Sequence, residues 1–188
     1  TEIYTLSLHD ALPILLTIVA AVAAAEAIEQ HIQARVAIKW PNDLFIGDRK
    51  VGGILMEVSG EADEVDWVVL GMGLNVNTEF SELPVALRRT ATSLKMAAGA
   101  VVDRSDVLAS LLLSLEAQYK AALRGGFEGA LTAFRERDYL LSRTISVETR
   151  QGPVVGAAAG IDDRGALLVE LPHRRVRSFH SGDVSLHK

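Results

Sequence analysis

The chain has 188 residues, of which 49% are apolar and 23% are charged, and it contains no cysteine. This apolar fraction supports a buried core and excludes a disordered chain, and the length fits one medium domain or one domain with a small appendage. The net charge of −5 argues against nonspecific nucleic-acid binding as the main task, and the lack of cysteine excludes disulfides, thiolate zinc sites and cysteine nucleophiles and suits a reducing cytoplasm.

The first segment, residues 1–14, fits poorly with the rest of the chain. It shows no clear periodicity, and it resembles a peptide that arises when sequencing-adapter DNA is translated by mistake. We therefore expect a non-native head in place of a natural one. The alternative is an ordinary frayed terminus.

A helix is predicted over Leu15–Ile32, where apolar residues recur at helical spacing among many alanines. The apolar run Ile14–Ala25 within it raises the alternative of a membrane span. Glu26 and Glu29 end that run well short of the roughly 20 residues that a spanning helix needs. We therefore expect a buried amphipathic helix in a protein without a membrane anchor.

Short strands dominate the next part of the chain. Pro41 ends the first of them because proline cannot donate to a strand ladder, and Gly47-Asp48 is typical of a hairpin tip. Gly52 and Gly53 indicate a β-bulge or a close approach of another group. The expected strands are Val36–Trp40, Leu44–Ile46, Lys50–Val58 and Asp66–Leu70, the last opening into a glycine-rich turn at Gly71 and Gly73.

Two helices and a second group of strands complete the chain. The helices are expected over Asp106–Leu123, capped by Ser105, and over Phe127–Leu140. From Ile145 onward, about five short strands separated by turns suit a small barrel. The chain is thus predicted to be α+β, with a mixed β-sheet backed by helices in residues 15–143 and a small β-barrel in residues 144–188.

The main candidate site combines Lys39, Asn42, Asp43 and Lys50. Two lysines can bind a phosphate or carboxylate, and the oxygens of Asn42 and Asp43 suit magnesium or ligand hydroxyls. Such a mixture near a turn and a hairpin suits a nucleotide-phosphate site. A solvated hairpin with an Asn-Asp turn explains the same residues without any function.

Gly71 and Gly73 form a second candidate site, because glycines at a strand end let backbone N–H groups approach a ligand. They do not form a dinucleotide-binding fingerprint, and the chain has no GxxxxGK[ST] phosphate loop. A plain glycine turn remains the alternative. The basic run Arg174–Arg177 is typical of a solvated face or of a contact with a partner, and the histidines are too scattered for a metal site.

Three blocks of this sequence resemble the biotin protein ligases. They are KWPNDL at Lys39–Leu44, DRKVGGILME at Asp48–Glu57 and GMGLNVN at Gly71–Asn77. Their order and spacing match that family, and the first two blocks together are specific to it. The resemblance covers residues 15–188, and it implies a class II synthetase-like catalytic core followed by an SH3-like barrel.

The resemblance also implies an activity and a set of ligands. Such an enzyme joins biotin to ATP with Mg²⁺, giving biotinyl-5′-AMP, and passes the biotinyl group to a lysine of a biotin carboxyl carrier protein. By position, Lys50 and Lys39 would be catalytic, with Lys50 at the biotin carboxylate and Lys39 near the phosphates. Gly53, Gly71 and Gly73 would line the biotin pocket, Asn42, Asp43 and Asn75 would bind the nucleotide, and Asp43 would help to place magnesium.

Parts of the family pattern are missing from this sequence. The Gly/Arg-rich loop that closes over the adenylate does not occur, and His187 stands near the position of an arginine in some members. We therefore expect a truncated copy that makes little or no biotinyl-adenylate by itself. No helix-turn-helix domain supports DNA binding.

Two other functions also fit the sequence. A lipoate–protein ligase would use the same adenylation chemistry, and binding of lipoate in preference to biotin would identify it. A non-catalytic protein-binding module is the alternative from another class. Family members pair sheets edge to edge, so a homodimer through the strand near Met56–Ser59 is a further possibility.

Overall fold

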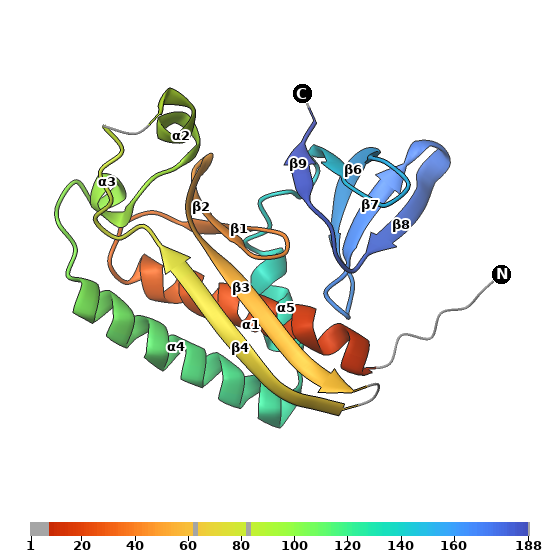
Figure 1. Ribbon diagram of the computed structural model, residues 1–188, viewed down its shortest axis with the longest axis horizontal. Helices are drawn as coiled ribbons and strands as arrows, with labels where there is room; N and C mark the ends of the chain where they lie inside the picture. Colours follow the sequence, from red (N-terminus) through yellow and green to blue (C-terminus); the bar gives the residue numbers. More distant parts are fainter. Residues whose placement is uncertain (1–7, 62–63, 82–83, 188) are drawn as a thin grey trace.

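In the computed structural model, two antiparallel sheets and five α-helices form the part of the chain that is described, residues 8–61, 64–81 and 84–187 (Figure 1). The α+β class is confirmed. The named strands pair only antiparallel, whereas a mixed sheet was expected, and parallel contacts are confined to two isolated bridges, Ile38 with Asp138 and Lys50 with Ala91.

The first sheet is a simple meander in the order β1-β2-β3-β4. Its strands are β1 (Val36–Lys39), β2 (Asp43–Ile46), β3 (Arg49–Glu61) and β4 (Glu64–Leu74). The register shifts where Leu44 opposes Gly52 and Phe45 opposes Lys50, so Val51 is the extra residue of a β-bulge, as the glycine pair predicted. The strand β4 continues through Gly71 and Gly73, so the expected glycine turn at these residues is wrong: both pair with β3.

Helix α1 (Leu8–Glu29) covers one face of this sheet (Figure 1). The predicted helix is confirmed, although it begins before Leu15 and ends before Ile32. Its segment Leu12–Glu29 is long and apolar enough to cross a membrane, but 72% of that segment is buried inside the protein. The helix therefore serves as the core against which the sheet packs. The non-native head proposed for residues 1–14 stays a prediction, and residues 1–7 lie outside the described residues.

Four further helices follow the first sheet. Two are short, α2 (Val85–Thr90) and α3 (Leu94–Ala98). Helix α4 (Arg104–Gly125) packs along α1, and its cap is Asp103, whose carboxylate accepts from the N–H groups of Ser105 and Asp106, so the expected Ser105 cap is wrong. Helix α5 (Glu128–Arg135) is shorter than predicted and buries Leu131 and Phe134.

The carboxyl-terminal residues form the second sheet, in the order β8-β7-β6-β5-β9. Its strands are β5 (Thr144–Val147), β6 (Val154–Ile161), β7 (Leu167–Leu171), β8 (Arg175–Phe179) and β9 (Val184–Leu186), with a 3-10 turn at Pro172–Arg174. Five strands were expected here. A closed barrel was also expected, but β8 and β9 do not pair with each other among the described residues.

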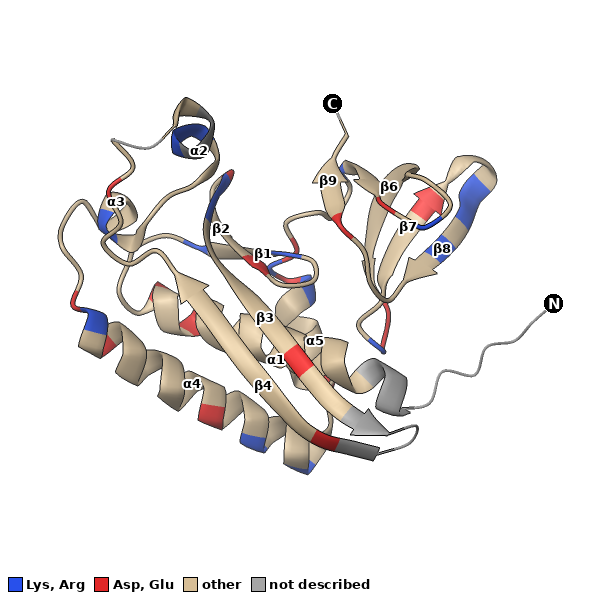
Figure 2. Ribbon diagram, in the orientation of Figure 1, with Lys and Arg blue, Asp and Glu red and all other residues tan. Residues whose placement is uncertain are grey.

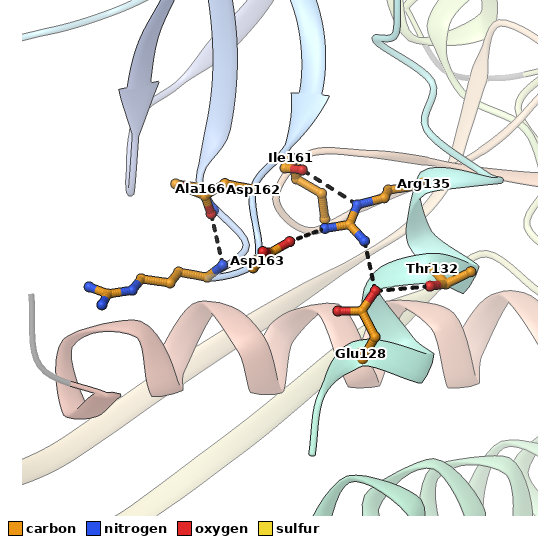
Figure 3. A network of polar contacts seen from close by, with 8 residues as sticks. Glu128, Thr132, Arg135, Ile161, Asp162, Asp163 and Ala166 are labelled. Atoms are coloured by element: carbon orange, nitrogen blue, oxygen red, sulfur yellow. Dashed lines mark hydrogen bonds and ion pairs between the residues drawn. The ribbon is translucent and has the colours of Figure 1, made fainter. Parts of the chain in front are cut away.

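Polar contacts tie the second sheet to the rest of the protein. The indole Nε1–H of Trp40, which is 1% exposed, donates to the carbonyl of Gly165 at 2.9 Å. Figure 3 shows a second connection, in which Arg135 of α5 reaches the turn between β6 and β7. Its guanidinium lies 2.9 Å from Asp163 and 3.1 Å from Glu128 of its own helix. The second sheet is thereby held beside the end of β1.

Candidate functional site

One row of residues crosses all four strands of the first sheet. Lys39 of β1 lies opposite Asp43 of β2, Asp43 opposite Gly53 of β3, and Gly53 opposite Gly73 of β4. Because side chains alternate between the two faces of a strand, and Leu44 and Ile54 point into the core beside α1, this row lies on the opposite face. We call this surface the front face.

An ion pair occupies the charged end of the front face. The Nζ of Lys50 lies 2.6 Å from Oδ1 of Asp43, with side chains that are 46% and 20% exposed. A Cβ atom added to Gly53 would lie 3.2 Å from that Asp43 oxygen and 3.3 Å from the Lys50 Nζ. Glycine therefore leaves the space above the ion pair open for a ligand.

The row and the ion pair line a hollow of about 800 Å³. Both sheets contribute to it, since Ser185 and Leu186 of β9 belong to its wall. The residues from the first sheet and its neighbours are Lys39, Asp43, Phe45, Asp48, Lys50, Gly52, Gly53, Gly73, Leu74, Asn75, Thr90, Ala91 and Tyr139. Six of the eight residues singled out in the sequence thus meet at one hollow: Lys39, Asp43, Lys50, Gly53, Gly73 and Asn75.

Asn42 and Gly71 lie outside the lining of this hollow. The Asn42 side-chain amide donates to the carbonyl of Ile54 at 2.7 Å, and the Asn42 carbonyl accepts from the N–H of Ile54 at 2.9 Å. Asn42 therefore joins the loop before β2 to β3. Gly71 lies one row further along the front face, opposite Leu55.

Beyond the glycines the front face exposes several apolar side chains, which Glu57 interrupts opposite Val69. Leu55, Val69 and Trp67 are 64%, 53% and 51% exposed, and they follow one another in successive rows of β3 and β4. Figure 2 shows charged segments around β1 and β2, one acidic segment on β3, and a β4 that is mainly tan. A ligand with an anionic head and a less polar body would match this gradient from lysines to apolar side chains.

A second hollow, of about 880 Å³, lies between α1, α4 and the far part of β4. Its wall is mainly apolar, with Leu16, Leu112 and Phe127 among the residues that form it. It contains no cation, so it lacks the groups that bind phosphate or carboxylate. The smaller hollow on the front face is therefore the candidate site.

No group of three or more histidine, aspartate or glutamate side chains in the described ranges could hold a metal ion by itself. Magnesium commonly takes only one or two protein carboxylates together with substrate phosphates and water. Asp43 supplies one carboxylate at the hollow, and Asp48 supplies another.

Sequence reasoning missed part of the wall of the hollow. Phe45, Asp48, Tyr139, Ser185 and Leu186 were not singled out, although they line it. Tyr139 and β9 lie some 90 to 150 positions from the lysines in the chain, and no local spacing connects them. Only the aromatic character of Phe45 and Tyr139 offered a signal, and it is not specific.

Comparisons with known proteins point to one family. Residues 4–75 match the model of the biotin/lipoate A/B protein ligase family, and residues 141–187 match that of the biotin protein ligase C terminal domain. The bifunctional ligase/repressor BirA of Bacillus subtilis is 36% identical over 171 residues, covering 91% of this chain and 52% of that protein. A biotin–[acetyl-CoA-carboxylase] ligase of Mycobacterium tuberculosis is 35% identical over 152 residues, 80% of this chain and 53% of its own length.

Solved structures agree with these relatives. The biotin protein ligase of Aquifex aeolicus in complex with biotin and ATP is 26% identical, with a TM-score of 0.79, over 93% of this chain and 72% of that one. Its apo structure gives a TM-score of 0.82. The chain spans about half the length of the curated relatives it matches.

Proposed function

Because this chain belongs to the biotin protein ligase family, we propose that its parent protein activates biotin with ATP and transfers the biotinyl group to a lysine of a carrier protein. The observation that carries this proposal is the front-face row from Lys39 to Gly73, with Lys50 paired to Asp43 beside it. These residues place two lysine cations on the same surface as glycines whose backbone is not covered by side chains.

In the first step, an oxygen of the biotin carboxylate attacks the α-phosphorus of ATP. A bond from that phosphorus to the bridging oxygen breaks, pyrophosphate leaves, and biotinyl-5′-AMP remains. Negative charge accumulates on the phosphate oxygens as the bond breaks. Lys50 and Lys39 lie at the same hollow and would stabilise that charge.

The glycines would form the floor for biotin. Above Gly73, an added Cβ would meet no atom within 4 Å, and at Gly71 the nearest atom would lie 3.7 Å away. Side chains at these positions would fill the space that the fused rings of biotin need. The exposed Leu55 beside Gly71 offers apolar contact to the body of the ligand.

The nucleotide would lie across the hollow from this floor. Asn75, directly after β4, would contact the adenine, and Asn42 would contribute its side-chain oxygen, since its amide nitrogen is engaged by Ile54. Asp43 would help to place Mg²⁺, which supplies further charge neutralisation at the phosphates when it is bound.

In the second step, the neutral amine of a carrier lysine attacks the acyl carbon, AMP leaves, and the amine loses a proton. The partner would be a biotin carboxyl carrier protein in the cytoplasm, and no nucleic-acid partner is proposed.

An edge-to-edge homodimer stays a prediction, and one feature supports it: β2 pairs with β3 only from Arg49 to Gly53. The β2-side edge of Leu55–Ser59 therefore has no partner strand among the described residues.

The decisive experiment compares two lysine variants of the intact parent protein. Lys50→Ala should lower biotin-dependent ATP–pyrophosphate exchange and carrier labelling by about 100-fold or more, because it removes a cation at the reacting phosphate. Lys95→Ala is the matched control, since Lys95 pairs with Glu79 outside the hollow and should leave both rates unchanged.

Undiminished labelling by the Lys50 variant would overturn the proposal. The 188-residue chain alone should show little or no exchange, because its sequence lacks the Gly/Arg-rich loop expected to shield the adenylate. Exchange at the rate of the intact parent would contradict that part.

A lipoate–protein ligase is the second candidate, because the family model matched by residues 4–75 includes lipoate ligases. Calorimetry of the intact parent with biotin and with lipoate separates the two. Tighter binding of lipoate would replace biotin as the proposed substrate.

A further inference from the structure

Side chains from two distant parts of the chain meet at the rim of the hollow. The Tyr139 hydroxyl donates to Oδ1 of Asp48 at 3.0 Å, and the Arg143 guanidinium lies 3.4 and 3.5 Å from the same oxygen. Asp48 lies at the tip of the hairpin between β2 and β3. Tyr139 and Arg143 belong to the segment that leads from α5 into the second sheet.

Two neighbouring side chains contact the ring of Tyr139. The Phe45 ring stacks on it at 4.5 Å between centroids, with 22° between the planes, and the Arg143 guanidinium carbon lies 4.1 Å from its centroid. Burial, followed by the hydrogen bond to Asp48, raises the pKa of the Tyr139 hydroxyl, so the group is protonated and can donate at neutral pH. We call Phe45, Asp48, Tyr139 and Arg143 the Tyr139 cluster.

The backbone fixes Tyr139 to the strand that carries Lys39. The N–H of Tyr139 donates to the carbonyl of Ile38 at 2.9 Å, and the N–H of Ile38 donates to the carbonyl of Arg137 at 2.8 Å. The side chain of Tyr139 then reaches the hairpin that carries Lys50, because Phe45 opposes Lys50 and Asp48 precedes it by two residues. One residue thus links both lysines of the site.

Arg143 extends this link to the second sheet. Its carbonyl accepts from the N–H of Ala158 in β6 at 2.9 Å, and β5 begins at the next residue. In turn, β5 pairs with β9 through Ser146 and Ser185, and Ser185 lines the hollow. The hairpin with Lys50 and the opposite wall of the hollow are therefore joined through the Tyr139 cluster.

We propose that Asp48, Tyr139 and Arg143 are positioning residues that hold the Lys50 hairpin at a set distance from the β9 wall and thereby set the affinity for ATP. This inference rests on the proposed function, since it assumes that ATP lies between Lys50 and β9. A merely stabilising role is the alternative. Asp48 and Arg143 have side chains that are 80% and 41% exposed, so their ion pair contributes little to global stability.

The first test uses hydrogen exchange in the 188-residue chain and needs no ligand. Tyr139→Phe keeps the stacked ring and removes only the hydroxyl that reaches Asp48. Amides of the hairpin around residues 45–50 should exchange about fivefold faster or more, while those of α4 keep their rates. Tyr119→Phe on α4 is the matched control. Unchanged exchange in the hairpin would overturn the proposed link.

The second test measures ligand affinity in the intact parent by calorimetry. Tyr139→Phe should weaken ATP binding by about fivefold, because the hairpin position varies. Biotin binding should weaken less, because its proposed floor at Gly71 and Gly73 lies on β4. Tyr119→Phe on α4 is the matched control and should leave both affinities unchanged. Equal losses for ATP and biotin, or none for ATP, would overturn the positioning role.

Failure of this inference is distinguishable from failure of the proposed function. A parent protein that binds neither biotin nor ATP contradicts the proposed function, while hydrogen exchange in the hairpin still decides whether Tyr139 restrains it. A parent that binds both ligands and loses neither in the Tyr139 variant contradicts the inference alone.

Discussion

The two faces of the first sheet are built from the same four strands, but one face is buried against α1 and the other carries exposed polar residues. On the face toward α1, Val36 and Ile38 are fully buried, and Leu44 and Ile54 are 3% exposed. On the front face, the neighbouring positions Lys39, Asp43 and Gly53 form a polar row, and Lys50 beside it is 46% exposed. Burial of the first set stabilises the fold, and this leaves the second set available for a ligand.

A core substitution on the α1 side should give the largest effect on stability. Ile38→Ala removes a fully buried side chain and should lower the free energy of unfolding by about 2 to 5 kcal/mol, since the lost contacts and the cavity add. Urea denaturation followed by circular dichroism measures the change. Lys39→Ala, one residue further and on the front face, should stay within about 0.5 kcal/mol of the natural protein. Equal losses for both would contradict the assignment of faces.

Gly52 and Gly53 are adjacent and lie on opposite faces of the sheet. Gly73 of β4 lies opposite Gly53 on the front face, so alanine substitutions at Gly52 and Gly73 compare the two faces. A Cβ on Gly52 would lie 2.7 Å from the Gly73 carbonyl oxygen, so Gly52→Ala should cost about 1 to 3 kcal/mol of stability. A Cβ on Gly73 would meet nothing within 4 Å. Gly73→Ala should therefore keep the stability within about 0.5 kcal/mol.

Gly73→Ala should weaken ligand binding even though it leaves the stability of the fold almost unchanged. In the intact parent, Gly73→Ala should lower biotin affinity by about tenfold, because the added methyl group occupies the proposed floor. Thermal melting and calorimetry on the same samples measure both effects. A Gly73 variant that binds biotin normally would remove Gly73 from the proposed floor.

Much of this division into faces could be predicted from the sequence. The blocks at Lys39–Leu44 and Asp48–Glu57 predicted strands and a hairpin, and the glycine pair predicted the bulge that turns Lys50 to the front. The strand through Gly71 and Gly73 was missed, because glycine disfavours strands unless a partner strand supplies the hydrogen bonds. The pairing with β3 depends on the folded structure and not on the local sequence, although β3 is close in the chain.

The rest of the site depends on contacts that local patterns do not encode. Asn42 stays a predicted nucleotide contact. Its amide also donates to the Ile54 carbonyl, a hydrogen bond that follows only from the geometry of β2 and β3. Tyr139 reaches the hollow through backbone hydrogen bonds to Ile38 of β1, and Ser185 reaches it because the second sheet lies beside the end of β1. Spacing in the sequence predicted the charged residues of one hairpin and missed the opposite wall.

The alternation of faces continues one residue past β1, where Trp40 points away from the front. Trp40→Phe keeps a ring in the core but removes the hydrogen bond to Gly165, leaving that carbonyl without its donor. We expect a loss of about 1 to 2 kcal/mol in the free energy of unfolding, measured by urea denaturation. Trp67→Phe on the exposed front face is the control and should change stability by less than about 0.5 kcal/mol. A larger effect at Trp67 would contradict this comparison.

The smallest effect concerns a carboxyl group on the buried side. Asp138 lies beside Ile38 of β1, and its Oδ1 accepts from the N–H of Leu140 at 2.8 Å. Its Oδ2 is buried and has no hydrogen-bond partner among the described residues. Burial raises the pKa of this carboxyl above its ordinary value of 3.8, and the backbone hydrogen bond only partly opposes that shift. The folded state therefore holds the proton more tightly than the unfolded state does.

The contribution of Asp138 should consequently be full below the ordinary pKa of 3.8 and should be lost as the pH rises through the raised folded pKa. Asp138→Asn has no such titration. Urea denaturation of both proteins between about pH 3 and pH 7 should show the natural chain losing stability relative to the variant as the pH rises. Subtracting the variant cancels the opposite trend of Asp103, whose pKa is lowered by backbone hydrogen bonds from Asp106 and Ser105. If the difference in free energy of unfolding between the two proteins stayed constant across this range, Asp138 would have the same pKa in the folded and unfolded states. Burial of its carboxyl group would then make no pH-dependent contribution to stability.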